Sequence, residues 1–395
     1  MKALFVTHSF PRLDGDAAGS FILRLAVGLA QQGVEVRVVA PSAPGLERSS
    51  VIQGIAIHRF RYAPRAYETL AYRGTMADDV AESTTAKAAL GSFLIAETAS
   101  VLSQVSAWKP DVIHAHWWFP NGVAASTASR LSGVPLVTTS HGTDLRLLKN
   151  RPVARPLARY VFRRSVRVTC VSEWLARQAA PLCRTAPIVV PMPVDVALFE
   201  PSNDRDANRI VFVGRLSAQK GIETAIRALA LMKRSIVLDV IGDGPDRAAL
   251  VDLAAQLGLS DQILWRGHVR HGEIPAFLSR SSALVAPFMD EGLGLVAAEA
   301  QLCETPPVGF ASGGLTDVIE NDVTGSLVAP GDVTALAAAL ERVVADPHLR
   351  ERLGHAGRAT ALARFSPSTV SKQYAEIYRD AVGGGGGGGR GSDAK

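Results

Sequence analysis

Two basic residues in the second half of the sequence could hold a phosphorylated ligand. Arg215 and Lys220 follow the β-branched run RIVFVG (209–214), and Lys220 comes directly before a helical pattern. Two cations beside a helix N-terminus form an anion site that fits a diphosphate. A pair of solvated loop charges would leave the same pattern in the sequence, so both interpretations stay open here.

Two acids lie eight positions apart in the stretch DEGLGLVAAEA (290–300). Glu291 opens a turn in which Gly292 and Gly294 let the backbone present N–H groups at the start of a helix. Glu299 lies among small apolar residues, and an ionised carboxylate is rarely buried without a partner. It could accept two hydrogen bonds from a vicinal diol such as a ribose, or it could pair with a neighbouring Arg or Lys.

Glycines mark two further places where a ligand could approach the backbone closely. The turn GDGPD (242–246) contains Gly242 and Gly244, and the loop SFPRLDGDAAGS places Gly15 and Gly19 before a helix. Glycine removes the Cβ that would otherwise hold a ligand away. Each of these turns is weak evidence when taken alone.

Histidines follow two strands of the first half. His141, in TTSHGTD, comes directly after a strand and could donate a hydrogen bond to a substrate hydroxyl, with a purely structural role as the alternative. His114 and His116 alternate along a strand end, which indicates a structural or acceptor-lining role. A metal site is not expected, because no third ligand has suitable spacing.

The elements that must position these residues alternate along the chain between short strands and amphipathic helices. This alternation predicts an α/β protein with parallel sheets. Ligands of such doubly wound sheets lie at the carboxyl ends of the strands, where the residues above are found. The expected strands are 3–8, 34–40, 111–116, 135–140 and 166–172, then 209–214, 237–242, 263–267 and 283–287, and the expected helices are 20–32, 221–232, 246–257 and 367–382.

The 395-residue length predicts two domains. We expect an N-terminal domain at 1–195, joined by the C-terminal helix, and a nucleotide-binding domain at 196–366, with a proline-rich hinge around 187–206. Residues 383–395 should form a disordered glycine-rich tail. A transmembrane helix and a signal peptide are not expected, and three cysteines without metal spacing fit a reducing cytoplasm.

The first half of the chain is basic. Residues 1–195 hold 22 Lys and Arg against 13 Asp and Glu. Arg151, Arg155, Arg159 and Arg163 recur at four-residue spacing, although Pro152 and Pro156 should delay the helix until about Leu157. This stretch could contact anionic headgroups at the cytoplasmic membrane face, or it could be a solvated basic face. Nucleic acid is not favoured, because no nucleic-acid-binding signature accompanies the charge.

In combination, these motifs resemble the retaining glycosyltransferases of family 4, which have the GT-B fold of two facing Rossmann-like domains with a cleft between them. The resemblance spans Met1 to about Val382. It is carried by the loop Gly15–Gly19, SHGTD (140–144), VSEW (171–174), PMPVD (191–195), VGRLSAQKG (213–221), GDGPDRAAL (242–250), RGHV (266–269), the E-x7-E pair and DVIENDVTGSLVAPGD (317–332).

The resemblance implies a role for each site residue. Arg215 and Lys220 would contact the diphosphate of a nucleotide-diphospho-sugar, Glu299 the ribose, and Glu291 the sugar ring. His141 would reach a sugar hydroxyl from the first domain, and no divalent metal or other cofactor would be needed. The backbone of Gly292, Leu293, Gly294 and Leu295 would meet the sugar and phosphate, His268 and Val269 would lie beside the base, and Gly15, Gly19 and Gly244 would allow close approach of the donor.

The implied activity is transfer of a hexose, with retention of configuration, from a UDP- or GDP-linked donor. The acceptor would be a glycan, a lipid-linked intermediate or a small molecule, in an enzyme that serves cell-envelope polysaccharide or glycolipid synthesis. The sequence departs from its relatives at EAQLCETPPV, where they often read EAMACGTPVV, so that Glu304 replaces a glycine.

The sequence leaves four alternative functions, and two of them are other enzymes on a similar fold. A nucleotide-sugar epimerase or phosphorylase could share the fold, and a non-catalytic nucleotide-sugar-binding protein could share the site. A nicotinamide-dependent oxidoreductase fits poorly, because the GDG turn lacks the third glycine and Arg266 stands where an acid is needed.

Overall fold

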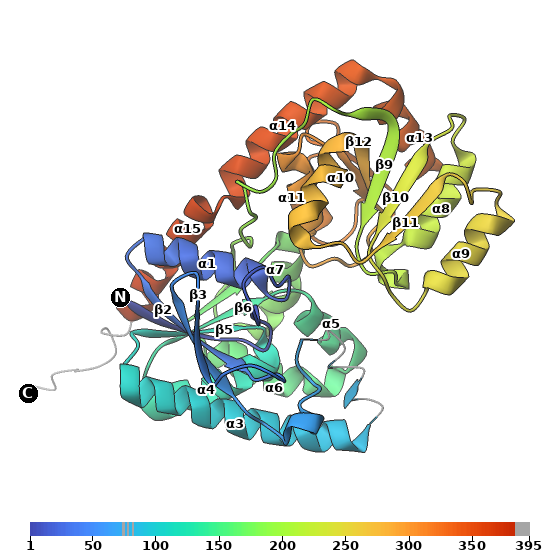
Figure 1. The fold of residues 1–395 in the computed structure, drawn as a ribbon. Coiled ribbons are helices and arrows are strands. Elements are labelled where there is room, and N and C mark those ends of the chain that lie inside the picture. Colours follow the sequence, from blue (N-terminus) through green and yellow to red (C-terminus); the bar gives the residue numbers. More distant parts are fainter. Residues whose placement is uncertain (73–75, 77–78, 81–82, 384–395) are drawn as a thin grey trace, which may run out of the picture. The chain divides into compact units, whose positions relative to one another are not determined.

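The structure, a computed structural model, describes residues 1–72, 76, 79–80 and 83–383. The chain folds into two compact units (Figure 1). The first comprises Met1–Val171, Leu175–Val190 and the chain from Val370 onward, and the second comprises Ser172–Trp174 and Pro191–Thr369. The division after Val190 falls inside the segment expected to be a hinge, and the expected tail lies outside the described residues.

The first unit is built on an eight-stranded sheet in the order β3-β4-β2-β1-β5-β6-β7-β8. Its strands pair in parallel except for the hairpin of β3 and β4. The central strands are buried on both faces, as is usual for parallel sheets covered by helices. The strands are β1 (Lys2–Val6), β2 (Glu35–Pro41), β3 (Ser49–Ile52), β4 (Ile55–Phe60), β5 (Val112–His116), β6 (Leu136–Ser140), β7 (Arg167–Cys170) and β8 (Ile188–Val189).

Helices cover this sheet, and the longest of them, α3, supplies much of the core. Phe93, Val101 and Trp108 of α3 are buried against the sheet. By length and composition α3 could also cross a membrane, with a mean hydropathy of 1.3 over its most apolar 18 residues. The helices are α1 (Ser20–Gln31), α3 (Thr84–Trp108), α4 (Val123–Ser132), α5 (Thr143–Asn150), α6 (Arg155–Arg164), α7 (Glu173–Ala179) and α15 (Pro367–Gly383).

The C-terminal helix α15 returns to the first unit, as expected. The Tyr378 hydroxyl lies 2.6 Å from Nδ1 of His114, and the Tyr374 hydroxyl lies 3.3 Å from Oγ1 of Thr139. Both tyrosines are fully buried, so the last helix is part of this core.

The second unit has a six-stranded parallel sheet in the order β11-β10-β9-β12-β13-β14. Its strands are β9 (Asp206–Val213), β10 (Val237–Ile241), β11 (Ile263–Gly267), β12 (Ser281–Ala286), β13 (Pro307–Phe310) and β14 (Ser326–Val328). Its helices are α8 (Ile222–Leu231), α9 (Arg247–Gln256), α10 (Ile274–Arg280), α11 (Leu295–Leu302), α12 (Leu315–Val318), α13 (Val333–Ala345) and α14 (Pro347–Phe365).

Two parallel, doubly wound units confirm the predicted fold class, and one predicted boundary needs correction. Helix α6 begins at Arg155 and not near Leu157. Pro156 lies in its first turn, where the missing N–H costs no hydrogen bond. The helix therefore carries Arg155, Arg159 and Arg163 together, and Arg151 lies before it.

Candidate functional site

The strand order of each sheet reverses at one point, and some of the predicted site residues follow the strands beside these points. In the second unit the reversal lies between β9 and β12, whose following loops carry Lys220 and Glu291. In the first unit it lies between β1 and β5, whose following loops carry Gly19 and Trp117. Loops at such switch points diverge and leave room for a ligand.

Lys220 and Glu291 meet directly at the switch point of the second unit. The Lys220 Nζ lies 2.8 Å from Oε2 of Glu291, and both side chains are about one-fifth exposed. The same ammonium lies 4.6 Å from the ring centre of Phe288, which adds a cation–π contact. Lys220 is thus held in place while part of its charge still faces solvent.

The loops that carry this pair are joined through their backbones. Gly221 has φ 64°, and a Cβ there would lie 2.2 Å from the carbonyl oxygen of Pro287. Met289 N donates to the carbonyl oxygen of Gln219 at 2.9 Å. Only glycine permits this approach, so Gly221 fixes the separation of the two switch-point loops.

Two helices begin at this point with glycine N-caps and no side-chain cap. Gly221 precedes α8 and Gly294 precedes α11, both in the left-handed conformation. The first turn of α11 also lacks an acidic residue. The N–H groups that open a helix have no acceptor inside it, so these two ends are suited to bind an anion.

The loop of Glu291 rests on a second glycine pair after β13. Gly314 N donates to the carbonyl oxygen of Glu291 at 2.7 Å, and Asp290 N donates to Oγ of Ser312 at 3.1 Å. A Cβ on Gly314 would lie 2.3 Å from the carbonyl oxygen of Gly292. These contacts hold the turn that leads into α11.

The GDG turn packs against the loop after β9. A Cβ on Gly242 would lie 2.0 Å from the carbonyl oxygen of Gly214, and one on Gly244 would lie 2.2 Å from that of Leu216. Gly242 N donates to the carbonyl oxygen of Gly267 at 2.8 Å. The glycines therefore bring three strand-end loops together, including the RGHV loop.

The remaining predicted donor residues of the second unit differ in exposure. Arg215 and His268 are exposed, and Val269 is half-buried. Arg215 has no hydrogen bond or ion pair within the described part of the chain. Glu299, on α11, is 8% exposed, as expected for an acid within a small-residue helix. Leu293 is buried, and Leu295 is the first residue of α11.

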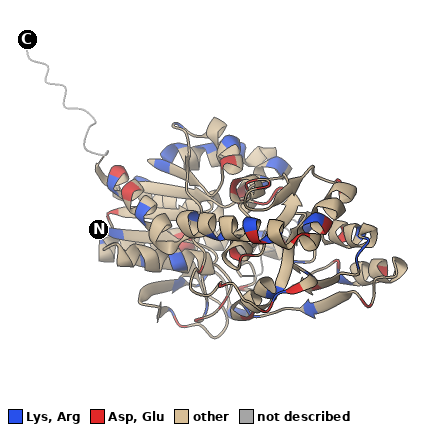
Figure 2. Cartoon of the chain, turned by 90° about the horizontal axis from the view of Figure 1, so that it is seen from above, with Lys and Arg blue, Asp and Glu red and all other residues tan. Residues whose placement is uncertain are grey.

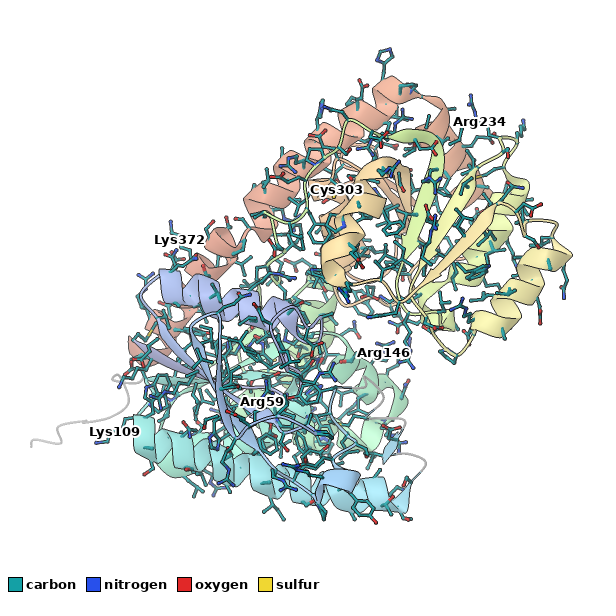
Figure 3. The ribbon with its side chains drawn as sticks, viewed as in Figure 1. Arg59, Lys109, Arg146, Arg234, Cys303 and Lys372 are labelled. Atoms are coloured by element: carbon teal, nitrogen blue, oxygen red, sulfur yellow. The ribbon has the colours of Figure 1, made fainter. Side chains whose placement is uncertain are left out.

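The predicted residues of the first unit lie at its own switch point. Gly19 is the left-handed N-cap of α1, and a Cβ there would lie 2.3 Å from the carbonyl oxygen of Ser9. Gly15 also has a positive φ, but a Cβ there would meet no other group within 4 Å. The buried guanidinium of Arg59 donates to the carbonyl oxygen of Pro11 at 2.6 Å and so anchors this loop (Figure 3).

Around His141 the structure adds aromatic and polar residues for which the sequence predicted no role. The ring of Trp117 lies 4.4 Å from that of His141 and 4.4 Å from that of His8. Asn121 Nδ2 lies 2.9 Å from Nδ1 of His8. Burial lowers the pKa of His8 to about 4, so this imidazole is neutral at pH 7.

Asp144 holds the loop that carries His141. Its Oδ1 accepts backbone N–H bonds from His141, Gly142 and Leu145 at 3.2, 3.0 and 3.1 Å. Its Oδ2 accepts the Trp118 N–H at 3.2 Å. Burial raises the pKa of this carboxyl, and the hydrogen bonds oppose the rise. The SHGTD motif gave a signal for Asp144, because an acid in the first turn of a helix commonly binds backbone N–H groups.

The comparisons with known proteins agree with this architecture. Residues 196–360 match the family model described as glycosyl transferases group 1, and residues 18–198 match glycosyltransferase family 4. The chain is 31% identical to a D-inositol 3-phosphate glycosyltransferase of Frankia alni, over 93% of this chain and 96% of that protein. It is 29% identical to a glycogen synthase of Mycobacterium tuberculosis, over 97% and 96% of the two chains.

Solved structures show the same fold. A sucrose-phosphate synthase from Thermosynechococcus elongatus superposes with a TM-score of 0.79 at 22% identity, covering 97% of this chain and 99% of that one. The Anabaena protein HepE, in complex with UDP-glucose, superposes with a TM-score of 0.73 at 20% identity, covering 95% and 99%.

The two doubly wound units and their switch-point loops therefore define a GT-B protein. The chain belongs to the family 4 glycosyltransferases, and it is a transferase of glycosyl groups.

Proposed function

We propose that this enzyme transfers a hexose from a nucleotide-diphospho-sugar, with retention of configuration and without a divalent metal. The observation that carries the proposal is the Lys220–Glu291 ion pair, whose two loops lead into α8 and α11, helices that begin without a side-chain cap. Such a site suits a group with two phosphates. We favour a UDP-linked donor over a GDP-linked one, because the similar fold of HepE holds UDP and UDP-glucose.

In this proposal the cations stabilise the leaving group. As the bond from C1 of the hexose to the diphosphate oxygen breaks, negative charge grows on the diphosphate. Lys220, Arg215 and the N–H groups of α11 would stabilise that charge, and fixed charges and dipoles of this kind usually contribute most to the rate enhancement. The acceptor oxygen bonds to C1 on the same face, and its proton passes to the departing phosphate oxygen.

The roles of the other residues follow from their positions. Glu291 holds Lys220 and would contact the sugar ring, and Glu299 would bind the ribose hydroxyls. His141 would donate to a sugar hydroxyl, and the base would lie beside His268 and Val269. Donor binding is thereby assigned to 196–366, and acceptor binding to 1–195.

A donor panel tests this function. Release of the nucleotide diphosphate is measured for UDP- and GDP-linked hexoses, with and without an acceptor extract and with EDTA. We expect nucleotide diphosphate to be released from only one of the donors and only when acceptor is present. EDTA should not reduce this release. Interconversion of the donor without release would indicate an epimerase, and binding without turnover would indicate a binding protein.

For the acceptor we propose a glycan or lipid-linked intermediate met at the cytoplasmic face of the membrane, with a small molecule as the other candidate. Charged residues of both signs are spread over the molecule (Figure 2), but residues 145–172 contain eight Lys and Arg and no Asp or Glu. A groove of about 660 Å³ runs along this stretch, and its lining includes Arg159, Arg163, Arg164 and Arg184.

Exposed apolar side chains accompany this basic groove. Val153 is 87% exposed, and Leu157 and Tyr160 are 39% exposed. Arginines with neighbouring apolar groups are suited to an anionic lipid surface, at about 1 kcal/mol per basic residue. Co-sedimentation with vesicles containing phosphatidylglycerol should exceed that with neutral vesicles and should fall when Arg159 and Arg163 are both changed to Gln. Equal binding to both vesicles would refute the membrane contact.

A further inference from the structure

The imidazole of His141 is hydrogen-bonded to a second histidine from the neighbouring strand. Nδ1 of His116, the last residue of β5, lies 3.2 Å from Nε2 of His141, which follows β6. His116 is fully buried, whereas His141 is half-buried. One nitrogen of His141 is therefore taken by His116, and only its Nδ1 remains for a ligand.

Both imidazoles are neutral at pH 7, so a single proton forms the hydrogen bond between Nδ1 of His116 and Nε2 of His141. Burial lowers the pKa of His116 and of His141 well below 6.5, and each pKa is lowered further by neighbouring histidines. The groups that face His141 are His116 and His8, the rings of Phe21 and Trp117, and the Asp144 carboxylate at its backbone N–H.

The direction of the shared hydrogen bond decides what His141 offers a ligand. If His116 donates, the proton of His141 must be on Nδ1, and the free nitrogen is a donor. If His141 donates, its Nδ1 is a bare acceptor. Because a neutral imidazole has one donor and one acceptor nitrogen, a third arrangement is not available.

The surroundings of His116 favour the first direction. Its Nε2 is buried and has no hydrogen-bond partner within the described part of the chain. Were His116 the acceptor, this Nε2 would carry a buried N–H without an acceptor. Buried donors without a partner are rarer than buried acceptors without one, so the proton belongs on Nδ1 of His116.

His114 provides a contrast on the same strand. Its Nδ1 lies 2.6 Å from the Tyr378 hydroxyl, and its Nε2 lies 2.6 Å from Oγ1 of Thr139. Both ring nitrogens of His114 are satisfied within the core. Of the two histidines of β5, only His116 extends toward the half-buried His141.

We propose that His116 is a positioning residue that donates its Nδ1–H to His141 and thereby fixes the tautomer of His141 in which Nδ1 carries the proton. The half-buried face of His141 then presents an N–H to a hydroxyl of the substrate. This role deepens the proposed function, since it concerns the same residue that is proposed to contact the sugar.

Long-range ¹H–¹⁵N NMR of the histidine-labelled protein tests the tautomer without any substrate. We expect His141, assigned through His141→Gln, to show a protonated Nδ1 and no change of state from pH 8 to pH 6. In His116→Leu the Nε2–H form of His141 should appear, and His116→Asn, whose amide can replace the Nδ1–H, should restore the original pattern. A protonated Nε2 on His141 in the unaltered protein would overturn the proposal.

Turnover supplies a second readout. His116→Leu should lower kcat by about tenfold or more and leave the KM for the donor nearly unchanged, while His116→Asn retains most of the rate. If the leucine variant does not fold, the tautomer in the unaltered protein and in His116→Asn still decides the outcome. If the tautomer is as expected but no donor is turned over, only the proposed function fails.

Discussion

The Glu291 carboxylate compensates the charge of Lys220, and this pairing explains how a partly buried cation is tolerated beside the switch point. The ion pair is half-buried, and the ring of Phe288 limits where the ammonium can move. A diphosphate carries more negative charge than one carboxylate, so it can compete for the ammonium. Glu291 would then be free to meet another group of the donor.

We expect Lys220→Ala to lower kcat by about 10²–10³, because one fixed charge aimed at the leaving group would be lost. Lys220→Arg serves as the matched control, since it keeps the charge but not the compact ammonium. Steady-state kinetics and thermal unfolding are measured on both. Wild-type turnover by the alanine variant would refute the diphosphate assignment, and a loss of activity matched by unfolding would leave Lys220 a structural role.

Glu304 has a backbone conformation that favours glycine. Its φ is 54°, in the left-handed region. A non-glycine residue is disfavoured there by about 1–2 kcal/mol, whereas glycine loses about 0.5–1 kcal/mol through the entropy of the unfolded chain. Glu304→Gly should therefore raise the free energy of unfolding by up to about 1.5 kcal/mol in urea denaturation. A clear loss of stability would show that its contact with His355 outweighs the strain.

The cations, acids and glycines of the second unit could be selected as candidate site residues from the sequence, because they belong to recognisable motifs that follow strands or open helices. The sequence did not indicate a role for His8, Trp117 or Asn121. Their contacts join different loops, and Asn121 and His8 are more than a hundred residues apart in the chain. Such pairings depend on strand order, which local patterns do not determine.

The strand-end loops of the second unit act as one element, because glycines let their backbones touch. Gly242 has φ 129° and leaves no space for a Cβ beside Gly214. Gly258 also has a positive φ of 70°, but nothing lies within 4 Å of its Cβ position. A substitution at Gly258 therefore measures only the cost of the left-handed conformation, whereas one at Gly242 adds the cost of a steric clash.

We expect Gly258→Ala to cost up to about 1.5 kcal/mol, the penalty of a left-handed alanine less the entropy that glycine loses on folding. Gly242→Ala should cost more, because the loop after β9 must also move, and it should weaken binding of UDP at least tenfold. Urea denaturation and calorimetric titration measure the two effects. Equal stability and equal UDP affinity in the two variants would show that the close approach of these loops is not needed.

Strands that are buried along their whole length, such as β5, β6 and β12, were predicted within a few residues, because short runs rich in β-branched and apolar residues mark them. The hairpin of β3 and β4 was not predicted. Its strands include Ser49, Ser50, His58 and Arg59, and exposed and buried side chains are mixed in them. The start of α6 was predicted wrongly because a proline such as Pro156 is equally acceptable in the first turn of a helix and just before the helix begins.

Taken as a whole molecule, the chain buries several histidines of its first unit in neutral form, which links its stability to pH. The folded pKa of His8 is about 4, below its ordinary value of 6.5. Protonation therefore favours the unfolded chain. The stabilising contribution is complete above pH 6.5 and is lost as the pH falls from 6.5 toward 4.

The slope of unfolding free energy against pH counts the protons taken up on unfolding. Near pH 5.5 we expect His8→Asn to take up about one proton fewer than the unaltered chain, because unfolded His8 is mostly protonated there and folded His8 is not. Urea denaturation at several pH values provides the slopes. Identical slopes would mean that His8 is not neutral in the fold.

The central claim is that the switch point of the second unit binds the diphosphate of the donor. A crystal structure of the enzyme with UDP tests it most directly. We predict that the diphosphate lies against Lys220, Arg215 and the first N–H groups of α11, with the ribose at Glu299. A nucleotide bound at another place, or a diphosphate that touches neither Lys220 nor Arg215, would contradict the account.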